Sequence, residues 1–192
     1  MGRAWYLDGK LEKKPHTFTD FIDCTKALID QGWSDPKRIA ARGGSAGGML
    51  MGAIANMAPD LYRAIVAEVP FVDCLTTILD PSLPLTTFEW EEWGNPVTDK
   101  AIYDIMKSYA PYENVVRVQY PYMLITAGLN DPRVSYWEPA KWAQRLRDKT
   151  INPRIILRTE MGAGHQGPSG RYETWHDEAF VYAFILSALE LE

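Results

Sequence analysis

The chain has 192 residues, 46% of them hydrophobic and 12% aromatic, so it can bury one sizeable core and is neither disordered nor fibrous. No run approaches the roughly 18 consecutive apolar residues of a membrane helix, and the N-terminus lacks the charged-then-apolar pattern of a signal peptide. The net charge of -5, without clusters of Lys or Arg, argues against a nucleic-acid partner. We therefore expect one cytoplasmic domain with neither nucleic-acid nor membrane partners.

The first predicted element is a helix from Thr17 to Gly32. Thr17 and Asp20 have the spacing of a variant capping box at its start, and the glycine ends it. Its apolar face is expected to carry Phe21, Cys24 and Leu28.

Helices and strands then alternate along the chain. Strands are expected at residues 37–42, 63–69, 121–128 and 154–158. Further helices are expected over about 46–58, 98–108, 136–149 and 172–189. The run at 121–128 is almost wholly apolar, which is typical of a parallel strand buried on both faces. The alternation predicts an α/β fold, a mostly parallel sheet with helices on both faces.

One stretch, residues 71–97, breaks this alternation and is rich in Pro, Thr and Glu. A connection of this length is usually either a functional segment or disordered. Its large aromatic residues, Phe88, Trp90 and Trp93, favour a functional segment.

The two cysteines, Cys24 and Cys74, lie on separate predicted elements and lack the spacing of a metal site. We expect them to be reduced, buried thiols rather than a disulfide. The sequence indicates no bound metal and no cofactor.

The segment from Arg38 to Leu50 predicts a strand, a sharp turn and a helix, with Ser45 at the apex of the turn. This is the pattern of a nucleophile elbow, in which the serine backbone is strained and side chains at Gly43 and Gly47 would collide with their surroundings. Ser45 Oγ would then stand free above the sheet edge, and the Ala46 N–H would point to a developing oxyanion. The alternative is a glycine-rich turn without chemistry.

A serine nucleophile needs a general base with a carboxylate behind it, in the order serine, acid, histidine. Asp131 follows the strand at 121–128, and His165 follows the strand at 154–158 in a glycine-flanked loop. Both would therefore leave the carboxyl edge of the sheet, where ligands bind in open α/β folds. His16 and His176 are expected on the surface.

In this interpretation Asp131 orients the imidazole, His165 takes the Ser45 proton and later protonates the leaving group, and the reaction is acyl transfer to water. Asp131 precedes a proline and could instead cap a turn. Asp73 and Asp104 are weaker substitutes for the acid.

Several longer strings carry a family resemblance: residues 43–52 (GGSAGGMLMG), 69–73 (VPFVD), 91–96 (EEWGNP), 136–142 (YWEPAKW) and 169–171 (SGR). They extend along the whole chain, which resembles the prolyl oligopeptidase family of serine peptidases and, within it, the oligopeptidase B group. The resemblance implies a cytosolic endopeptidase that cuts short peptides after Arg or Lys. It also implies an α/β-hydrolase domain capped by a β-propeller.

By position, the resemblance places the carboxylates that bind the P1 side chain at Glu89 and Glu91. A buried guanidinium needs a carboxylate partner, and the acidic cluster Glu89, Glu91 and Glu92 fits that need. Otherwise the cluster is a solvated charge run. Arg133 resembles the family arginine that binds the substrate backbone near P2, with a surface salt bridge as the alternative.

Residues 1–190 then correspond to the C-terminal portion of an α/β-hydrolase peptidase domain, and Leu191-Glu192 resembles a vector-derived tail. The N-terminal strands of the full fold are absent, together with the loop whose tyrosine supplies a second oxyanion donor. Losing such a donor costs about 10² to 10³ in turnover. We therefore expect a weakly active or inactive fragment.

The strand at 37–42 would become an exposed sheet edge in such a fragment. We expect it to be covered by the missing N-terminal hydrolase segment and β-propeller, or by self-association. The substrates implied are short basic peptides. The alternatives are an esterase or acylaminoacyl-peptidase-like hydrolase, because these chemistries share the elbow and triad, or a non-catalytic association module.

Overall fold

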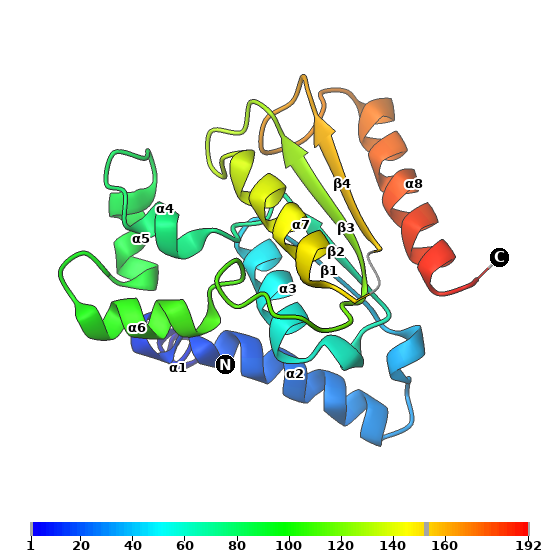
Figure 1. The fold of residues 1–192 in the computed structure, drawn as a ribbon, viewed down its shortest axis with the longest axis horizontal. Coiled ribbons are helices and arrows are strands. Elements are labelled where there is room, and N and C mark those ends of the chain that lie inside the picture. Colours follow the sequence, from blue (N-terminus) through cyan, green and yellow to red (C-terminus); the bar gives the residue numbers. More distant parts are fainter. Residues whose placement is uncertain (1, 152–153, 192) are drawn as a thin grey trace.

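The computed structural model describes residues 2–151 and 154–191. The expected tail at Leu191-Glu192 therefore lies partly outside the described residues, at Glu192. The described part forms one four-stranded sheet with strand order β1-β2-β3-β4, every neighbouring pair being parallel (Figure 1). The strands are β1 (Ala40–Gly44), β2 (Ala64–Glu68), β3 (Tyr122–Gly128) and β4 (Ile155–Glu160).

Helices connect the strands and flank the sheet. They are α1 (Arg3–Leu7), α2 (Pro15–Asp30), α3 (Ala46–Met57), α4 (Cys74–Ile78), α5 (Thr86–Trp93), α6 (Lys100–Tyr109), α7 (Trp137–Lys149) and α8 (Arg171–Ala188). Short 3-10 turns occur at Leu11–Lys13, Pro36–Arg38 and Pro59–Leu61. No described helix combines the length and the apolar character needed to span a bilayer.

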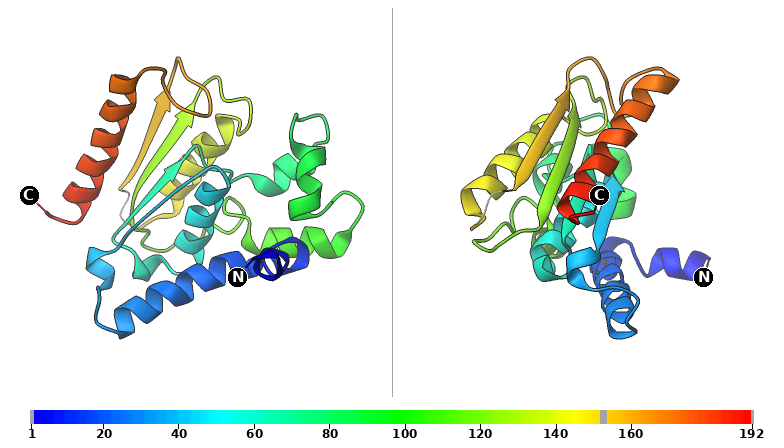
Figure 2. Two further views of the ribbon diagram at one scale, coloured as in Figure 1. Left: turned by 180° about the vertical axis from the view of Figure 1, so that it is seen from behind. Right: turned by 90° about the vertical axis from the view of Figure 1, so that its right-hand side faces the viewer.

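Helices cover both faces of the sheet, as the sequence predicts. α3 and α7 pack on one face and α8 packs on the other (Figure 2). Alternate residues of β2 serve the two sides, because successive side chains of a strand point in opposite directions. Ile65 and Ala67 belong to the larger core with α3 and α7, whereas Val66 packs with Leu124 and with Val181 of α8.

The first strand begins later than expected. Residues 36–38 form a 3-10 turn capped by Asp35, whose carboxylate accepts a hydrogen bond of 2.8 Å from the Lys37 N–H. The predicted strand at 37–42 is therefore shifted to Ala40–Gly44. The remaining predicted strands and helices match the observed ones to within about two residues.

Helix α2 differs from the prediction in its N-terminal cap and in the side chains that it buries. It begins at Pro15, and its N-cap residue makes no side-chain cap. The Thr17 hydroxyl instead donates to the Gly9 carbonyl. The buried side chains are Phe18, Ile22 and Thr25. Of the predicted face, Phe21 is half-buried against the core, as expected, while Cys24 and Leu28 are exposed.

Both cysteines are free thiols, but the expectation of burial is right for Cys74 alone. Cys24 lies on the outward face of α2, because the stripe that meets the core is offset from the predicted one by one position. Cys74 begins α4 and is fully enclosed, which raises the pKa of its thiol well above the usual value.

The stretch at 71–97 folds into α4 and α5 rather than an irregular loop. Trp93 at the end of α5 is buried and contributes to a second core cluster with Phe71 and Tyr109. Phe88, on the same helix, is 79% exposed. Trp93 therefore anchors α5 to this second cluster, whereas Phe88 is left in solvent.

Candidate active site

Ser45 lies at the sharp turn between β1 and α3, at the carboxyl end of the sheet. Its φ of 57° is in the left-handed region, which is uncommon for a residue with a side chain. Backbone hydrogen bonds hold it there. The Ser45 N–H donates to the backbone carbonyl of Glu68 at 2.9 Å, and the Ser45 carbonyl accepts from the Phe71 N–H at 3.0 Å. Strain of this kind persists only where the surroundings impose it, and it is common at active sites.

The glycines around Ser45 allow the turn to close, although not all of the predicted ones do so. A Cβ at Gly43 would lie 2.5 Å from the Gly47 carbonyl oxygen, as expected. The expected collision at Gly47 is wrong, because a Cβ there would meet nothing within 4 Å. The crowded position is Gly48, where a Cβ would lie 2.5 Å from the Pro70 Cβ.

Asp131 and His165 contact each other at the same edge of the sheet. His165 Nδ1 lies 2.7 Å from Asp131 Oδ2, and both side chains are nearly enclosed, with 8% and 0% of their surface exposed. The other carboxylate oxygen accepts from the Arg133 and Val134 N–H groups at 2.8 and 3.0 Å. With Nδ1 facing the carboxylate, Nε2 is the ring nitrogen left for proton transfer.

The two loops meet because glycine allows their backbones to approach closely. A Cβ at Gly128 would lie 2.7 Å from the Gly164 carbonyl oxygen. Next to it, the Asn130 N–H donates to the Ala163 carbonyl at 3.2 Å. The end of β3 thus runs beside the loop that carries His165.

The alternative acids are committed elsewhere. The Asp73 carboxylate bonds to Lys141, and Asp104 pairs with Lys100 one turn away on α6. His16 and His176 are exposed, as expected. Of the three candidate acids, only Asp131 contacts His165.

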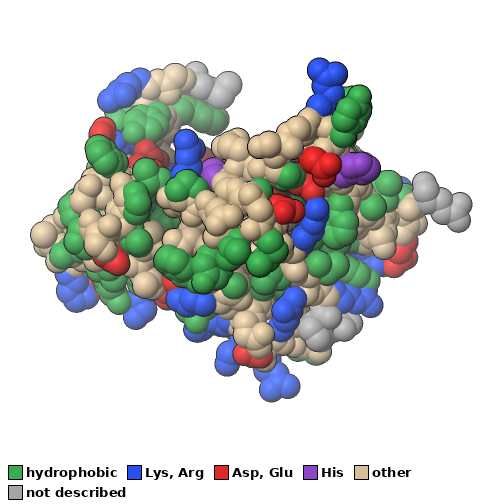
Figure 3. All heavy atoms as spheres, turned by 90° about the horizontal axis from the view of Figure 1, so that it is seen from above, with side chains coloured by type: hydrophobic (Ala, Val, Ile, Leu, Met, Phe, Trp, Pro, Cys, Tyr) green, Lys and Arg blue, Asp and Glu red, His purple; other side chains and the backbone are tan. Residues whose placement is uncertain are grey.

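Ser45 and His165 are not hydrogen-bonded to each other among the described residues. Ser45 lines one pocket, and His165 lines a neighbouring one between the carboxyl ends of the strands and α8. Figure 3 looks onto this end of the molecule, where acidic, basic and histidine side chains reach the surface. The structure thus joins His165 to Asp131 and leaves Ser45 beside a separate opening.

The Ser45 pocket holds two more of the predicted site residues, Glu89 and Arg133. Ala46, the first residue of α3, also lines it. An N–H in the first turn of a helix has no acceptor within the helix, so the Ala46 N–H is available to an oxyanion. The wall includes Phe71, Thr77 and Trp93.

Glu91 does not line this pocket. It is 86% exposed and forms an ion pair of 3.6 Å with Lys10. Residues two apart on a helix point in different directions, so Glu89 and Glu91 of α5 cannot face the same opening from adjacent positions. Glu92 likewise faces the N-terminal segment, where it accepts from Lys14 Nζ at 2.9 Å.

Trp93 is a pocket residue whose role the sequence did not reveal. Its indole Nε1–H donates to Glu89 Oε2 at 2.6 Å, one helical turn away, and the Lys14 ammonium lies 4.2 Å from its ring centroid. The spacing of four residues between Glu89 and Trp93 was the available signal. The indole therefore fixes one oxygen of a carboxylate that faces the Ser45 pocket.

No group of three or more His, Cys, Asp or Glu side chains among residues 2–151 and 154–191 is arranged to hold a metal ion.

Comparison with known proteins supplies relatives over the whole chain. The sequence model of the prolyl oligopeptidase family matches residues 1–192. Protease 2 of Moraxella lacunata is 57% identical over 193 residues, which covers 100% of this chain and 28% of that protein. Dipeptidyl aminopeptidase BI of Pseudoxanthomonas mexicana is 53% identical over 190 residues, covering 98% of this chain and 26% of that protein.

Solved structures agree. Oligopeptidase B from Trypanosoma brucei with covalently bound antipain, in its closed form, superposes with a TM-score of 0.97 at 47% identity, over 100% of this chain and 27% of that one. Oligopeptidase B from Leishmania major gives a TM-score of 0.95 at 47% identity, over 98% of this chain and 26% of that one. The chain thus spans little more than a quarter of the length of the relatives it matches.

The elbow geometry predicts opposite effects at neighbouring glycines. Gly48→Ala should lower the free energy of unfolding by about 1–3 kcal/mol, because its methyl group would overlap Pro70. Gly47→Ala, the control, should be neutral or stabilising by up to about 1 kcal/mol, because Ala is the better helix former. Denaturant unfolding measures both, and equal effects would contradict this account of the turn.

The Asp131–His165 contact predicts the reactivity of Ser45 toward a fluorophosphonate. Asp131→Asn should slow labelling by at least about 100-fold, the scale of general-base assistance, whereas Asp104→Asn should label at the unsubstituted rate. Mass spectrometry locates the adduct, which Ser45→Ala should abolish. If the Asp131→Asn protein were labelled at the wild-type rate, Asp131 would have no part in activating Ser45.

Proposed function

The chain belongs to the prolyl oligopeptidase family, and on that basis we propose that it is the catalytic part of a serine peptidase that cuts short peptides after Arg or Lys. The observation that carries the proposal is the placement of the Glu89 carboxylate in the same pocket as Ser45. With its cationic side chain bound to Glu89, an Arg or Lys of the substrate would present its own backbone carbonyl to Ser45.

The proposed reaction uses the groups at the sheet edge. His165 Nε2, which is not hydrogen-bonded to Ser45 in this structure, must first come within reach of Ser45 Oγ. It then takes the Oγ proton as Oγ attacks the carbonyl carbon, and the Ala46 N–H stabilises the resulting oxyanion. His165 then returns the proton to the departing amine, leaving an acyl-enzyme. Water repeats the sequence and frees the acid. Asp131 keeps the ring in the required tautomer and stabilises its cation.

Relatives of similar identity show why the pocket, rather than the family, supports the choice of substrate. One is named Protease 2 and another Dipeptidyl aminopeptidase BI, at 57% and 53% identity. Proteins of closely similar sequence are therefore named for different activities, and we infer that substrate choice depends on the side chains that line the pocket.

Within the pocket we assign the recognition of a cation to Glu89 and not to Glu91. Trp93 already bonds to one Glu89 oxygen, and the other can accept from a guanidinium or ammonium group. Glu91 pairs with Lys10 and is open to water, so it holds α5 near the N-terminal segment. Arg133 is exposed at the same opening, where it can donate to a peptide carbonyl.

Replacement of Glu89 therefore tests whether this carboxylate, and not Glu91, binds the cationic side chain of the substrate. Glu89→Gln should lower kcat/KM for an arginyl amide by about 100-fold, because a desolvated cation loses its charged partner. Glu91→Gln, the matched control, should stay within about threefold, since exposed ion pairs contribute little.

Two outcomes would contradict this assignment. An equal loss in Glu91→Gln would mean that both carboxylates bind the substrate. Equal rates on arginyl and neutral substrates in the unsubstituted protein would instead favour an esterase or acylaminoacyl-peptidase-like hydrolase.

We also propose that the free edge of β1 is covered in the functional protein. Within the described residues β1 pairs only with β2, which leaves one side of its backbone without a strand partner. The chain spans 28% of Protease 2, so the remainder of a longer protein, including an N-terminal hydrolase segment and a β-propeller, is the proposed cover. Self-association, as a non-catalytic module would show, is the alternative.

Light scattering distinguishes a covered edge from an open one. The isolated chain should have a mass above the 21.8 kDa of one copy and little activity on an arginyl amide, because its exposed edge would recruit a second copy. A monomer with full activity would contradict the need for any cover.

A further inference from the structure

Glu138 is a buried carboxyl group for which the proposed reaction has no use. It lies in the first turn of α7 and is 1% exposed. Its Oε2 accepts from the Asp73 N–H at 2.9 Å, and its Oε1 accepts from the Thr77 hydroxyl at 2.7 Å. The two carboxylate oxygens thus bond to the residue that precedes α4 and to a residue of its last turn.

The partners of Glu138 belong to a wall of the Ser45 pocket. Thr77 lines that pocket directly, and its carbonyl accepts from the Thr86 hydroxyl at the start of α5 at 2.9 Å. The segment leading to α4 is also tied to the serine, because the Phe71 N–H donates to the Ser45 carbonyl. One carboxyl group therefore holds the element that lies between the nucleophile and the helix carrying Glu89.

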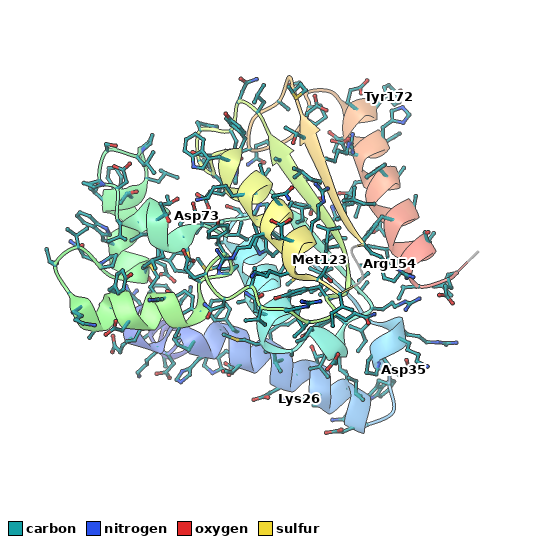
Figure 4. The ribbon with its side chains drawn as sticks, viewed as in Figure 1. Lys26, Asp35, Asp73, Met123, Arg154 and Tyr172 are labelled. Atoms are coloured by element: carbon teal, nitrogen blue, oxygen red, sulfur yellow. The ribbon has the colours of Figure 1, made fainter. Side chains whose placement is uncertain are left out.

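Burying a carboxyl group is unfavourable, so its presence calls for a reason beyond packing. Burial raises the pKa of Glu138 to about 7, with the neighbouring Asp73 carboxylate adding to the shift. Asp73, which lies just before α4 (Figure 4), is itself enclosed. It bonds to Lys141, one turn further along α7 than Glu138. An apolar side chain could fill this space, but it could not make two directional bonds to α4.

The position of Glu138 along the chain links the two halves of the site. α7 begins directly after the loop of Asp131, and Val134 in that loop lines the same pocket as Thr77. The Glu138 N–H donates to the Ser135 carbonyl at 3.0 Å, so the carboxyl group stands on the turn that leaves the acid loop.

We propose that Glu138 is a positioning residue, which sets the pocket wall formed by α4 against the loop of the catalytic acid and so determines how tightly the pocket holds a substrate side chain. It takes no part in the reaction itself. The inference rests on the proposed function of this pocket.

The test compares Glu138→Leu, Glu138→Gln and Thr77→Val with Thr76→Val, whose hydroxyl lies on the exposed side of α4. The protein is used at its natural length. Glu138→Leu should raise KM for an arginyl amide about tenfold, the equivalent of about one buried hydrogen bond, while fluorophosphonate labelling of Ser45 stays within about twofold.

Rescue and coupling distinguish positioning from general damage. Glu138→Gln should stay near the unsubstituted KM, because an amide oxygen can accept from Asp73 and its NH₂ can donate to the Thr77 hydroxyl. Glu138→Leu combined with Thr77→Val should be no worse than Glu138→Leu alone. An unchanged KM in Glu138→Leu, or a loss of fluorophosphonate labelling as large as the rise in KM, would overturn the proposal.

Amide hydrogen exchange gives a readout independent of turnover. Residues 73–79 should exchange at least about tenfold faster in Glu138→Leu than in the Thr76→Val control. Without the Glu138 carboxylate, α4 can open without breaking the bonds to the Asp73 N–H and the Thr77 hydroxyl. Unchanged exchange would overturn the proposal even in an inactive protein. A lack of preference for arginyl substrates in the unsubstituted protein, with exchange as expected, would instead reject the proposed function and leave the tie between α7 and α4 intact.

Discussion

The parallel pairing of the four strands is the constraint on which the site depends. Parallel strands end at one edge, and short loops from that edge carry Ser45, Asp131 and His165 although they are far apart in the chain. Close approach of the loops is then possible only where side chains are absent, as at Gly128 beside Gly164. The sheet thus brings the three residues to one edge, and the glycines allow the loops of Asp131 and His165 to come into contact.

Charge is divided around α5 by the N-terminal segment. Lys10 and Lys14 face Glu91 and Glu92, and this leaves Glu89 as the carboxylate that faces the serine. Trp93 contributes to both sides of this division, since its indole bonds to Glu89 while its ring lies under Lys14. A run of acidic residues that is uniform in the sequence becomes one carboxylate that lines the Ser45 pocket and two that pair with lysines of the N-terminal segment. Glu138 is likewise an acidic residue with structural bonds, since its buried carboxyl group bonds to Asp73 and Thr77 at the wall of the Ser45 pocket.

Local features were predictable where short-range chemistry decides them. The turn at Ser45 follows from its flanking glycines, and the strands follow from apolar runs, so most boundaries were right to within about two residues. The errors arose where a neighbour decides. The stripe Phe21, Cys24, Leu28 and the stripe Phe18, Ile22, Thr25 both follow helical spacing. Packing buries the second and covers only Phe21 of the first.

The sequence by itself determined the order of the elements, the strained turn and the small set of residues able to serve as nucleophile, base and acid. Only the tertiary structure decided that Asp131, rather than Asp73 or Asp104, contacts His165, that Gly48 is crowded and Gly47 is free, and that Glu89 faces the pocket. The physical reason is that spacing along a chain fixes which side chains share a face, whereas contact with a partner depends on elements that are distant in sequence and meet only when the sheet is assembled.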